Sequence, residues 1–293
     1  MADPQPVRLF DPADAPAALV LVGCGGTGGF VARNAARLLW GLQQARLQAR
    51  RQPAFGPPAP EGVPGVLIAD GDEVERGNVV RQDFLPADVG RAKALVLAER
   101  LTAAYGLEVS AYPRYLGASG PFGDLIPEES IVVGCVDNAA TRRLLHERLS
   151  RYRNVVYLDS GNGAVSRASH APGRRPSRVD LRRERESGWS GQVVCGVRKG
   201  GETLLPFPGD AMPDLLEGDG PEDGIPDEIP CHAVVETRPQ RFLTNLRAAT
   251  VIMEYLGPLL ADGHLLHART FFDARRGYAK SYPAVDELDE VAV

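Results

Sequence analysis

The feature that most constrains this chain is an alternation of strand-like and helix-like segments from residue 17 to about residue 160. Short, continuous apolar runs predict buried strands at 17–22, 65–69 and 130–135, and further strands are predicted at 108–112 and 154–159. Helical spacing of apolar residues predicts helices at 29–42, 92–105 and 139–150. This order predicts an α/β fold in which a mainly parallel sheet carries helices on both faces.

The second half of the chain follows a different pattern. A strand at 192–197, antiparallel to a neighbour, is expected to extend the sheet, and a strong apolar periodicity predicts a helix at 241–256. The arginine-rich stretch 165–188 predicts a solvated loop, with a docking site for an acidic partner as the alternative. Taken together, residues 1–293 are expected to form a single domain with inserted loops near 43–64, 165–188 and 206–230.

Composition excludes several classes of protein. The net charge of −5 lacks the basic footprint of a nucleic-acid-binding protein. No apolar run approaches the roughly 18 residues that cross a bilayer, and the N-terminus lacks the pattern of a signal peptide. We therefore expect a cytoplasmic protein with no membrane or nucleic-acid partner. The four cysteines are widely spaced and form no Cys-x-x-Cys pair, so no structural zinc is expected.

A glycine-rich turn lies between the first predicted strand and the first predicted helix. Gly23, Gly25 and Gly28 fit Gly-x-Gly-x-x-Gly, in which glycines let the backbone approach a phosphate at a helix N-terminus. The pattern is typical of Rossmann-like nucleotide sites. A plain NAD site has its acidic residue about 20 residues further on. Asp70 lies much further away, so the NAD interpretation requires the segment 43–64 to be an insertion.

Charged and polar residues follow the later predicted strands. Asp70 can accept hydrogen bonds from ribose hydroxyls, and Asn78, Arg81 and Lys93 can donate to the oxygens of a polyphosphate. Asp137 can hold Mg²⁺ through one carboxylate, with a helix N-cap as the alternative role. The alternative for Lys93 is a solvated helix lysine. Three acidic residues are expected at one edge of the sheet: Asp70, Asp137 and Asp159.

Four motifs together resemble the ThiF/MoeB/ubiquitin-activating-enzyme superfamily, and most closely the bacterial ThiF-like proteins of PRTRC-type gene clusters. They are Gly23-Cys24-Gly25-Gly26-Thr27-Gly28, Asp70-Gly71-Asp72 with Asn78 and Arg81-Gln82, Lys93, and Cys135-Val136-Asp137-Asn138-Ala139-Ala140-Thr141-Arg142. The resemblance runs from about residue 18 to about residue 256. Two features of the family are missing, namely its zinc-binding Cys-x-x-Cys pairs and its N-terminal arginine motif, for which Arg8 is a weak candidate.

The resemblance implies an ATP- and Mg²⁺-dependent enzyme. Such an enzyme adenylates the C-terminal glycine of a ubiquitin-like or sulfur-carrier protein and releases pyrophosphate. By position, Asp70 would hold the ribose, and Asn78, Arg81 and Lys93 would hold the phosphates. The other residues expected to contact the nucleotide are Gly23, Gly25, Gly26, Gly28, Asp72, Asp137 and Asn138. Asp137 would also ligate Mg²⁺. The family further implies a homodimer and a conjugating-enzyme-like protein as a later partner.

Cys231 is the candidate for a second chemical step. In the family, a cysteine at this place can take the activated acyl group as a thioester, and a loop thiol with a lowered pKa suits that transfer. The alternative is a buried or unused cysteine. The other three, Cys24, Cys135 and Cys195, are expected to be packing residues or to have no chemical role.

Three functions therefore remain open on the sequence. The first is an activating enzyme for a ubiquitin-like or sulfur-carrier protein. The second is an NAD-dependent oxidoreductase, against which Arg81 and Lys93 argue, because hydride transfer has no triphosphate to neutralise. The third is a catalytically silent scaffold, against which the joint presence of Asp70, Arg81, Lys93 and Asp137 argues.

Overall fold

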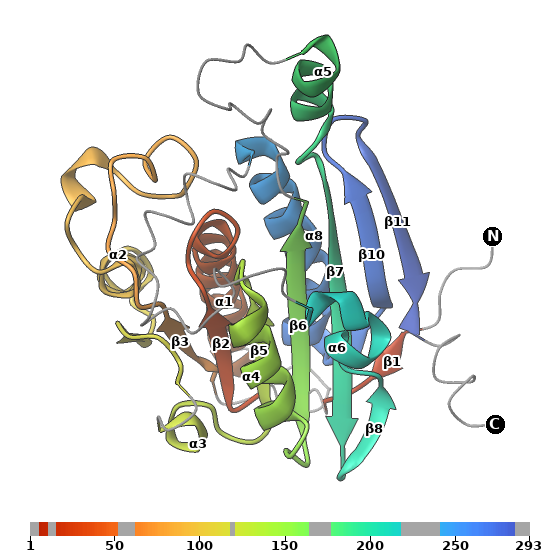
Figure 1. The fold of residues 1–293 in the computed structure, drawn as a ribbon. Helices are drawn as coiled ribbons and strands as arrows, with labels where there is room; N and C mark the ends of the chain where they lie inside the picture. The colour runs from red at the N-terminus through yellow and green to blue at the C-terminus, as the bar shows by residue number, and fades with distance from the viewer. Residues whose placement is uncertain are drawn as a thin grey trace, which may run out of the picture.

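A nine-stranded mixed sheet organises the molecule (Figure 1). The computed structural model describes residues 6–10, 16–51, 62–117, 121–163, 177–217 and 241–284. The strands lie in the order β11-β10-β7-β6-β5-β2-β3-β4, and β8 pairs with β7 outside this path. Their bounds are β2 Ala18–Val22, β3 Gly65–Ala69, β4 Val109–Tyr112, β5 Ser130–Gly134, β6 Val155–Asn162, β7 Ser190–Lys199, β8 Glu202–Leu205, β10 His267–Asp273 and β11 Tyr278–Pro283.

The parallel part of the sheet confirms the predicted fold class. β2 is central and pairs in parallel with β3 on one side and with β5 on the other. β4 and β6 continue the parallel pairing outward. The chain order therefore reverses direction between β2 and β5, which is where ligands of such sheets bind. The predicted antiparallel extension is also confirmed, because β7 runs antiparallel to both β6 and β10.

Helices cover both faces of this sheet. The long helices α1 (Gly28–Arg51), α2 (Lys93–Tyr105) and α8 (Phe242–Asp262) pack on one face. The short helix α3 (Phe122–Leu125), α4 (Ala139–Leu149) and α6 (Pro208–Ala211) pack on the other. The remaining elements are α5 (Arg178–Glu186), the 3₁₀ turns Pro86–Asp88 and Pro213–Leu215, and a small separate pair formed by β1 (Val7–Arg8) and β9 (His264–Leu265). In the described part of the chain, no helix has the length and apolar character that crossing a bilayer requires.

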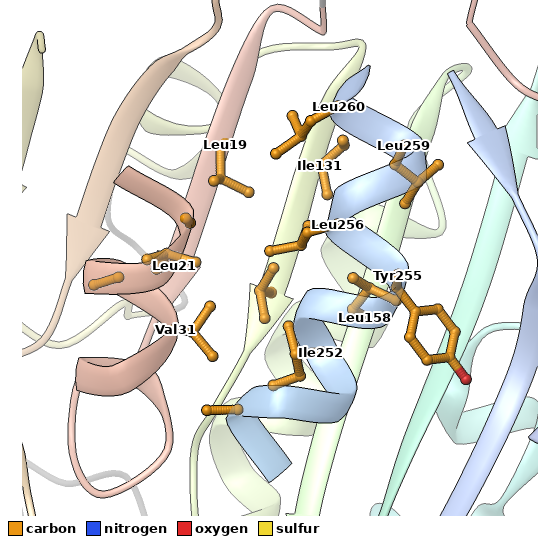
Figure 2. Close-up of a cluster of buried hydrophobic side chains, with 14 of the residues drawn as sticks. Leu19, Leu21, Val31, Ile131, Leu158, Ile252, Tyr255, Leu256, Leu259 and Leu260 are labelled. Atoms are coloured by element: carbon orange, nitrogen blue, oxygen red, sulfur yellow. The ribbon is translucent and has the colours of Figure 1, made fainter. Parts of the chain in front are cut away.

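The larger core lies between the sheet and the helices α1 and α8. Figure 2 shows Leu21 of β2, Ile131 of β5 and Leu158 of β6 facing Val31 of α1 and Ile252 of α8. All five side chains are fully buried. Removing an aliphatic side chain of this size from water is worth about 1.5–3 kcal/mol. This packing holds the first turns of α1 and α8 side by side above the carboxyl ends of the strands.

Two segments that were predicted to be loops contain helix. α1 continues to Arg51 instead of ending at residue 42, because 43–50 consists largely of good helix formers such as Gln, Ala, Leu and Arg. Arg46 ties this extension to the carbonyls of Gly62 and Leu260. Residues 52–61 lie outside the described residues.

The arginine-rich stretch was also predicted to be a loop, and here the structure corrects the prediction over 178–186, which form α5. The helix is stabilised by Arg241, whose guanidinium donates to the carbonyls of Glu184 and Ser187 at its C-terminal end. The same guanidinium lies 4.3 Å from the centre of the Trp189 ring. Within 206–230, residues 208–211 form α6, and 218–230 lie outside the described residues. The hairpin β10–β11 was not predicted.

Candidate functional site

The carboxyl ends of β2, β3 and β5 meet at one edge of the sheet. Val22, the last residue of β2, is paired with Ala69 at the end of β3 and with Gly134 at the end of β5. The segments that follow these three residues therefore start side by side. They are the glycine turn 23–28, the acidic segment 70–72 and the loop 135–138, so the structure gathers the predicted motifs at the expected edge.

The glycine turn is packed so tightly that side chains are excluded at several of its positions. Gly23 has a φ of +83°, and a Cβ there would lie 2.9 Å from the carbonyl oxygen of Cys135. A Cβ on Gly26 would lie 1.9 Å from the Asn245 amide nitrogen, and one on Gly28 1.9 Å from the Gly23 carbonyl oxygen. Gly25 is partly exposed. The turn leads directly into α1, whose free N-terminal amides favour an anion.

Asp70 is buried at the end of β3 and fixed by two backbone amides. Its Oδ2 accepts from the Cys24 amide at 2.6 Å, and its Oδ1 accepts from the Asp72 amide at 2.8 Å. Burial raises the pKa of Asp70, while Lys93 and the two amides oppose that rise. Each carboxylate oxygen has further acceptor capacity, since an ionised carboxylate can accept about four hydrogen bonds.

Lys93 is the first residue of α2, and it is buried rather than solvated, so the solvated-lysine alternative is wrong. Its Nζ lies 2.8 Å from Asp72 Oδ2, and the Tyr115 hydroxyl donates to the other Asp72 oxygen. Burial would lower the pKa of Lys93, but the charges of Asp70 and Asp72 outweigh it and raise that pKa above its usual value. Lys93 therefore stays charged.

Asn78 and Arg81 lie on the turn between Asp72 and α2. Asn78 is almost fully buried, and its Oδ1 accepts from the Glu75 amide at 2.9 Å, so its side chain shapes the turn. Arg81 is half-buried. Burial lowers the pKa of Arg81, and the charges of Asp137 and Glu75 oppose that effect. Asp137, in the loop after β5, is therefore close enough to Arg81 for their charges to interact.

The sequence left two roles open for Asp137, a ligand of Mg²⁺ and the N-cap of the helix that follows. Asn138, not Asp137, is the N-cap of α4, because its Oδ1 accepts from the Thr141 amide at 2.8 Å. Asp137 is exposed and forms no hydrogen bond or ion pair with any residue in the part of the chain that the structure describes. Its carboxylate is therefore available to a ligand.

Asp159 lies level with this edge, as predicted, because it pairs with Gly134 at the end of β5, but it does not end its own strand. Asp159 lies within β6, which continues to Asn162, and it is 1% exposed. The Arg142 guanidinium donates to it at 3.1 Å, and the Tyr157 hydroxyl donates to it at 3.1 Å. Both oxygens of its carboxylate accept from the protein, and burial closes it to a ligand.

One polar cluster beneath the glycine turn was missed by the sequence analysis. The Asn162 amide nitrogen donates to Asn245 Oδ1 at 2.9 Å and to the Thr27 hydroxyl at 3.1 Å. Asn245 is fully buried in the first turn of α8 and its amide nitrogen has no partner among the described residues. Its sequence signal was a polar residue in line with Ala249, Ile252 and Leu256 on the apolar stripe of the helix.

The cysteines that the structure describes behave as packing residues. Burial raises the pKa of the Cys24, Cys135 and Cys195 thiols, so none of them is activated as a thiolate. Cys231 lies outside the described residues. Arg8 lies in β1, where its Nε donates to His264 at 3.3 Å.

Comparison with known proteins identifies the family. The sequence model of the ThiF family matches residues 16–165. No protein of curated function gives a significant match to this sequence.

Solved structures of similar fold include Escherichia coli MccB with ATP, at a TM-score of 0.54 and 16% identity over 92% of this chain and 64% of that one. MccB alone gives a TM-score of 0.53 and 17% identity over 91% of this chain and 62% of that one. The microcin C7 biosynthetic enzyme MccB in complex with N-formylated MccA gives 0.52 and 17%, over 92% and 64%. The chain thus spans less than two-thirds of the length of these proteins, and at such identities they show the fold alone.

Proposed function

Because the chain belongs to the ThiF family, we propose that it is an ATP-dependent activating enzyme that adenylates the C-terminal glycine of a ubiquitin-like or sulfur-carrier protein. In this proposal residues 1–293 act as one adenylation unit. The observation that carries it is the joint placement, at one sheet edge, of an anion-binding helix N-terminus, the buried cation Lys93, and the carboxylate of Asp70 with acceptor capacity to spare. The solved complexes of MccB with ATP and with N-formylated MccA support it, since that protein has the same fold.

The proposed reaction joins a carboxylate to the α-phosphorus of ATP. Asp70 would accept from the ribose hydroxyls, and the glycine turn would hold phosphate oxygens against the amides of α1. An oxygen of the terminal carboxylate forms a bond to the α-phosphorus. The bond from that phosphorus to the bridging oxygen of the β-phosphate breaks, and pyrophosphate leaves with the electron pair. No proton is transferred, so the work of the protein is alignment and charge stabilisation by Lys93 and Arg81.

The residues present also fit a magnesium ion. The described residues contain no cluster of three or more His, Cys, Asp or Glu that could enclose a metal. Mg²⁺ in nucleotide sites does not need one, because it takes one or two carboxylates and completes its shell with phosphate oxygens and water. Asp137 is the exposed carboxylate that would hold it. When bound, the ion would neutralise phosphate charge.

Exchange of radiolabelled pyrophosphate into ATP, in the presence of candidate carrier proteins, tests the proposal. We expect carrier-dependent exchange that is abolished by Asp137→Ala and retained by Asp124→Ala, an exposed acidic residue of α3. An oxidoreductase or a silent scaffold would show no exchange. If the wild-type protein binds ATP but shows no exchange with any carrier tried, the enzymatic proposal is overturned.

Cys231 would act after adenylation. Its thiolate sulfur would form a bond to the acyl carbon, the bond from that carbon to the phosphate oxygen would break, and AMP would leave. A thiol-sensitive adduct with the carrier should form in the wild type and in Cys195→Ala, and should be lost in Cys231→Ala. If the adduct persists in Cys231→Ala, this cysteine is not the acceptor.

A homodimer and a conjugating-enzyme-like partner complete the proposal. Sedimentation of the isolated protein tests whether it is a dimer.

A further inference from the structure

Tyr115 occupies a place at the site edge that no motif assigns to it. It lies in the segment after β4, and β4 is the neighbour of β3 in the sheet. A Cβ on Gly71 would lie 2.6–2.7 Å from three carbons of the Tyr115 ring. The ring therefore packs against the bare backbone of Gly71. This backbone joins Asp70, which faces the glycine turn, to Asp72, which faces Lys93.

The hydroxyl of the same side chain reaches the charged part of the site. It donates to Asp72 Oδ1, while Asp72 Oδ2 lies 2.8 Å from Lys93 Nζ. Asp72 is thus held between a phenol and an ammonium group. Since Lys93 is only 5% exposed, the direction in which its ammonium group points depends on where Asp72 is held. Tyr115 thus contacts the Asp72 oxygen that Lys93 does not.

We propose that Tyr115 is the specificity-determining residue at the nucleoside end of the site and the positioning residue for Asp72 and Lys93. This inference rests on the proposed function. A ribose bound to Asp70 lies one residue from Gly71, so the base attached to it comes against the aromatic ring that packs on Gly71. An aromatic ring offers a flat apolar surface on which a base can stack. The hydroxyl acts at the other end of the nucleotide, because it fixes Asp72 and so orients Lys93 toward the phosphates.

The two roles separate when a ligand with a nucleoside is compared with one without. Binding of ATP and of inorganic tripolyphosphate should be measured by calorimetry for the wild type, Tyr115→Phe and Tyr115→Leu. Tyr115→Phe keeps the ring and loses the hydroxyl, so we expect both ligands to weaken by about threefold, with their affinity ratio unchanged. Tyr115→Leu also loses the stacking surface, so the ratio of ATP to tripolyphosphate affinity should fall by about tenfold. Tyr278→Leu, at an exposed tyrosine of β11, is the matched control and should change neither value.

Gly71→Ala provides a second test that leaves the tyrosine in place. The added Cβ must displace the ring, so the ATP to tripolyphosphate ratio should fall as it does in Tyr115→Leu. In the Tyr115→Leu background the same substitution should lower the ratio by less than twofold more, because the ring it displaces is gone. These ratios remain informative if a variant is less stable, since both ligands are measured on the same folded protein.

The outcomes distinguish this inference from the proposed function. Wild-type protein that binds ATP, with an unchanged ratio in Tyr115→Leu and Gly71→Ala, would overturn the stacking role and leave the adenylation proposal standing. Unchanged tripolyphosphate affinity in Tyr115→Phe would overturn the positioning role. Wild-type protein that binds neither ligand would overturn both the proposed function and the inference that rests on it.

Discussion

Two ion pairs lie at the same edge of the sheet, and they differ in how far their acidic residue is open to a ligand. In the half built on β3, Lys93 pairs with Asp72 at 2.8 Å, and the Asp72 side chain is 24% exposed. In the half built on β6, Arg142 pairs with Asp159 at 3.1 Å, and the Asp159 side chain is 1% exposed. The residue types in the two pairs are similar. Because their surroundings differ, the two pairs have different roles.

The β6 pair is closed by the protein. Asp159 also accepts from Tyr157, and Arg142 donates to the carbonyls of Val136 and Ser160. Because Val136 directly precedes Asp137, this pair holds the loop that carries the exposed carboxylate. The β3 pair is partly open and lies beside Asp70, which can accept further hydrogen bonds. An acid that is buried and bonded to the protein through both oxygens therefore supports a site, whereas a partly open one can bind a ligand.

Breaking the closed pair should have the largest effect on stability. Arg142→Met leaves the Asp159 carboxylate buried without its cation, and removal of one partner of a buried pair costs about 3–5 kcal/mol. The free energy of unfolding from urea titration measures this loss. Arg142→Met combined with Asp159→Asn should recover part of it, since no uncompensated charge remains. A loss below about 1 kcal/mol in the single variant would contradict the comparison.

The same variant should show a pH dependence of definite sign. Burial raises the pKa of Asp159 above its value in the unfolded chain, and the charge of Arg142 opposes that rise. Without Arg142 the folded-state pKa rises further. A raised folded-state pKa contributes stability at low pH that is lost as the pH rises through it. Arg142→Met should therefore be less destabilised, relative to wild type, at pH 5 than at pH 8, and the reverse order would contradict this account.

Breaking the open pair should affect catalysis more than stability. Lys93→Met leaves Asp72 with the Tyr115 hydroxyl and with water, so we expect a loss of only about 1–2 kcal/mol in the free energy of unfolding. Pyrophosphate exchange should fall by about 100- to 1000-fold, as is typical when a group that stabilises transition-state charge is removed. Lys199→Met, at an exposed lysine at the end of β7, is the control. If Lys93→Met lowered the free energy of unfolding by as much as it raised the activation free energy of exchange, the distinction between the two pairs would be lost.

The sequence predicts the half of the site that depends on local patterns. The apolar runs before Gly23, Asp70 and Asp137 identify three parallel strands, and the topology of such sheets then places the residues after them at one edge. The sequence does not predict which acidic residue is buried and bonded to the protein instead of being open to a ligand. Asp159 depends on Arg142, which reaches it from α4, and nothing in a pattern of apolar residues says which way a polar side chain on a helix will point.

Features stabilised by distant residues were likewise not predicted. α5 is held by Arg241, which is more than fifty residues away along the chain. The Asn162–Asn245 contact spans 83 residues, and β10 pairs with β7 through residues such as Arg269 and Val194, which are far apart along the chain. Such contacts depend on how distant elements pack together and have no signal in a local pattern of residues. This is why the strands and the glycine turn were predictable and the cluster beneath the turn was not.

The last of the expected effects concerns that cluster, which connects the two halves because Asn162 ends β6 and Thr27 belongs to the glycine turn. In Gly26→Ala the new Cβ would lie 1.9 Å from the Asn245 amide nitrogen, so either the turn or the start of α8 must move. Overpacking of this kind costs about 1–3 kcal/mol, and ATP affinity should fall with it. Gly41→Ala, in the middle of α1 with no atom within 4 Å of the added Cβ, is the matched control and should raise the free energy of unfolding by about 0.5–1 kcal/mol. Asn245→Ala removes the amide that collides with the new methyl group, so Gly26→Ala should cost less in that background. If it costs the same there, Asn245 is not what keeps position 26 a glycine, and the two halves of the site are not joined through this contact.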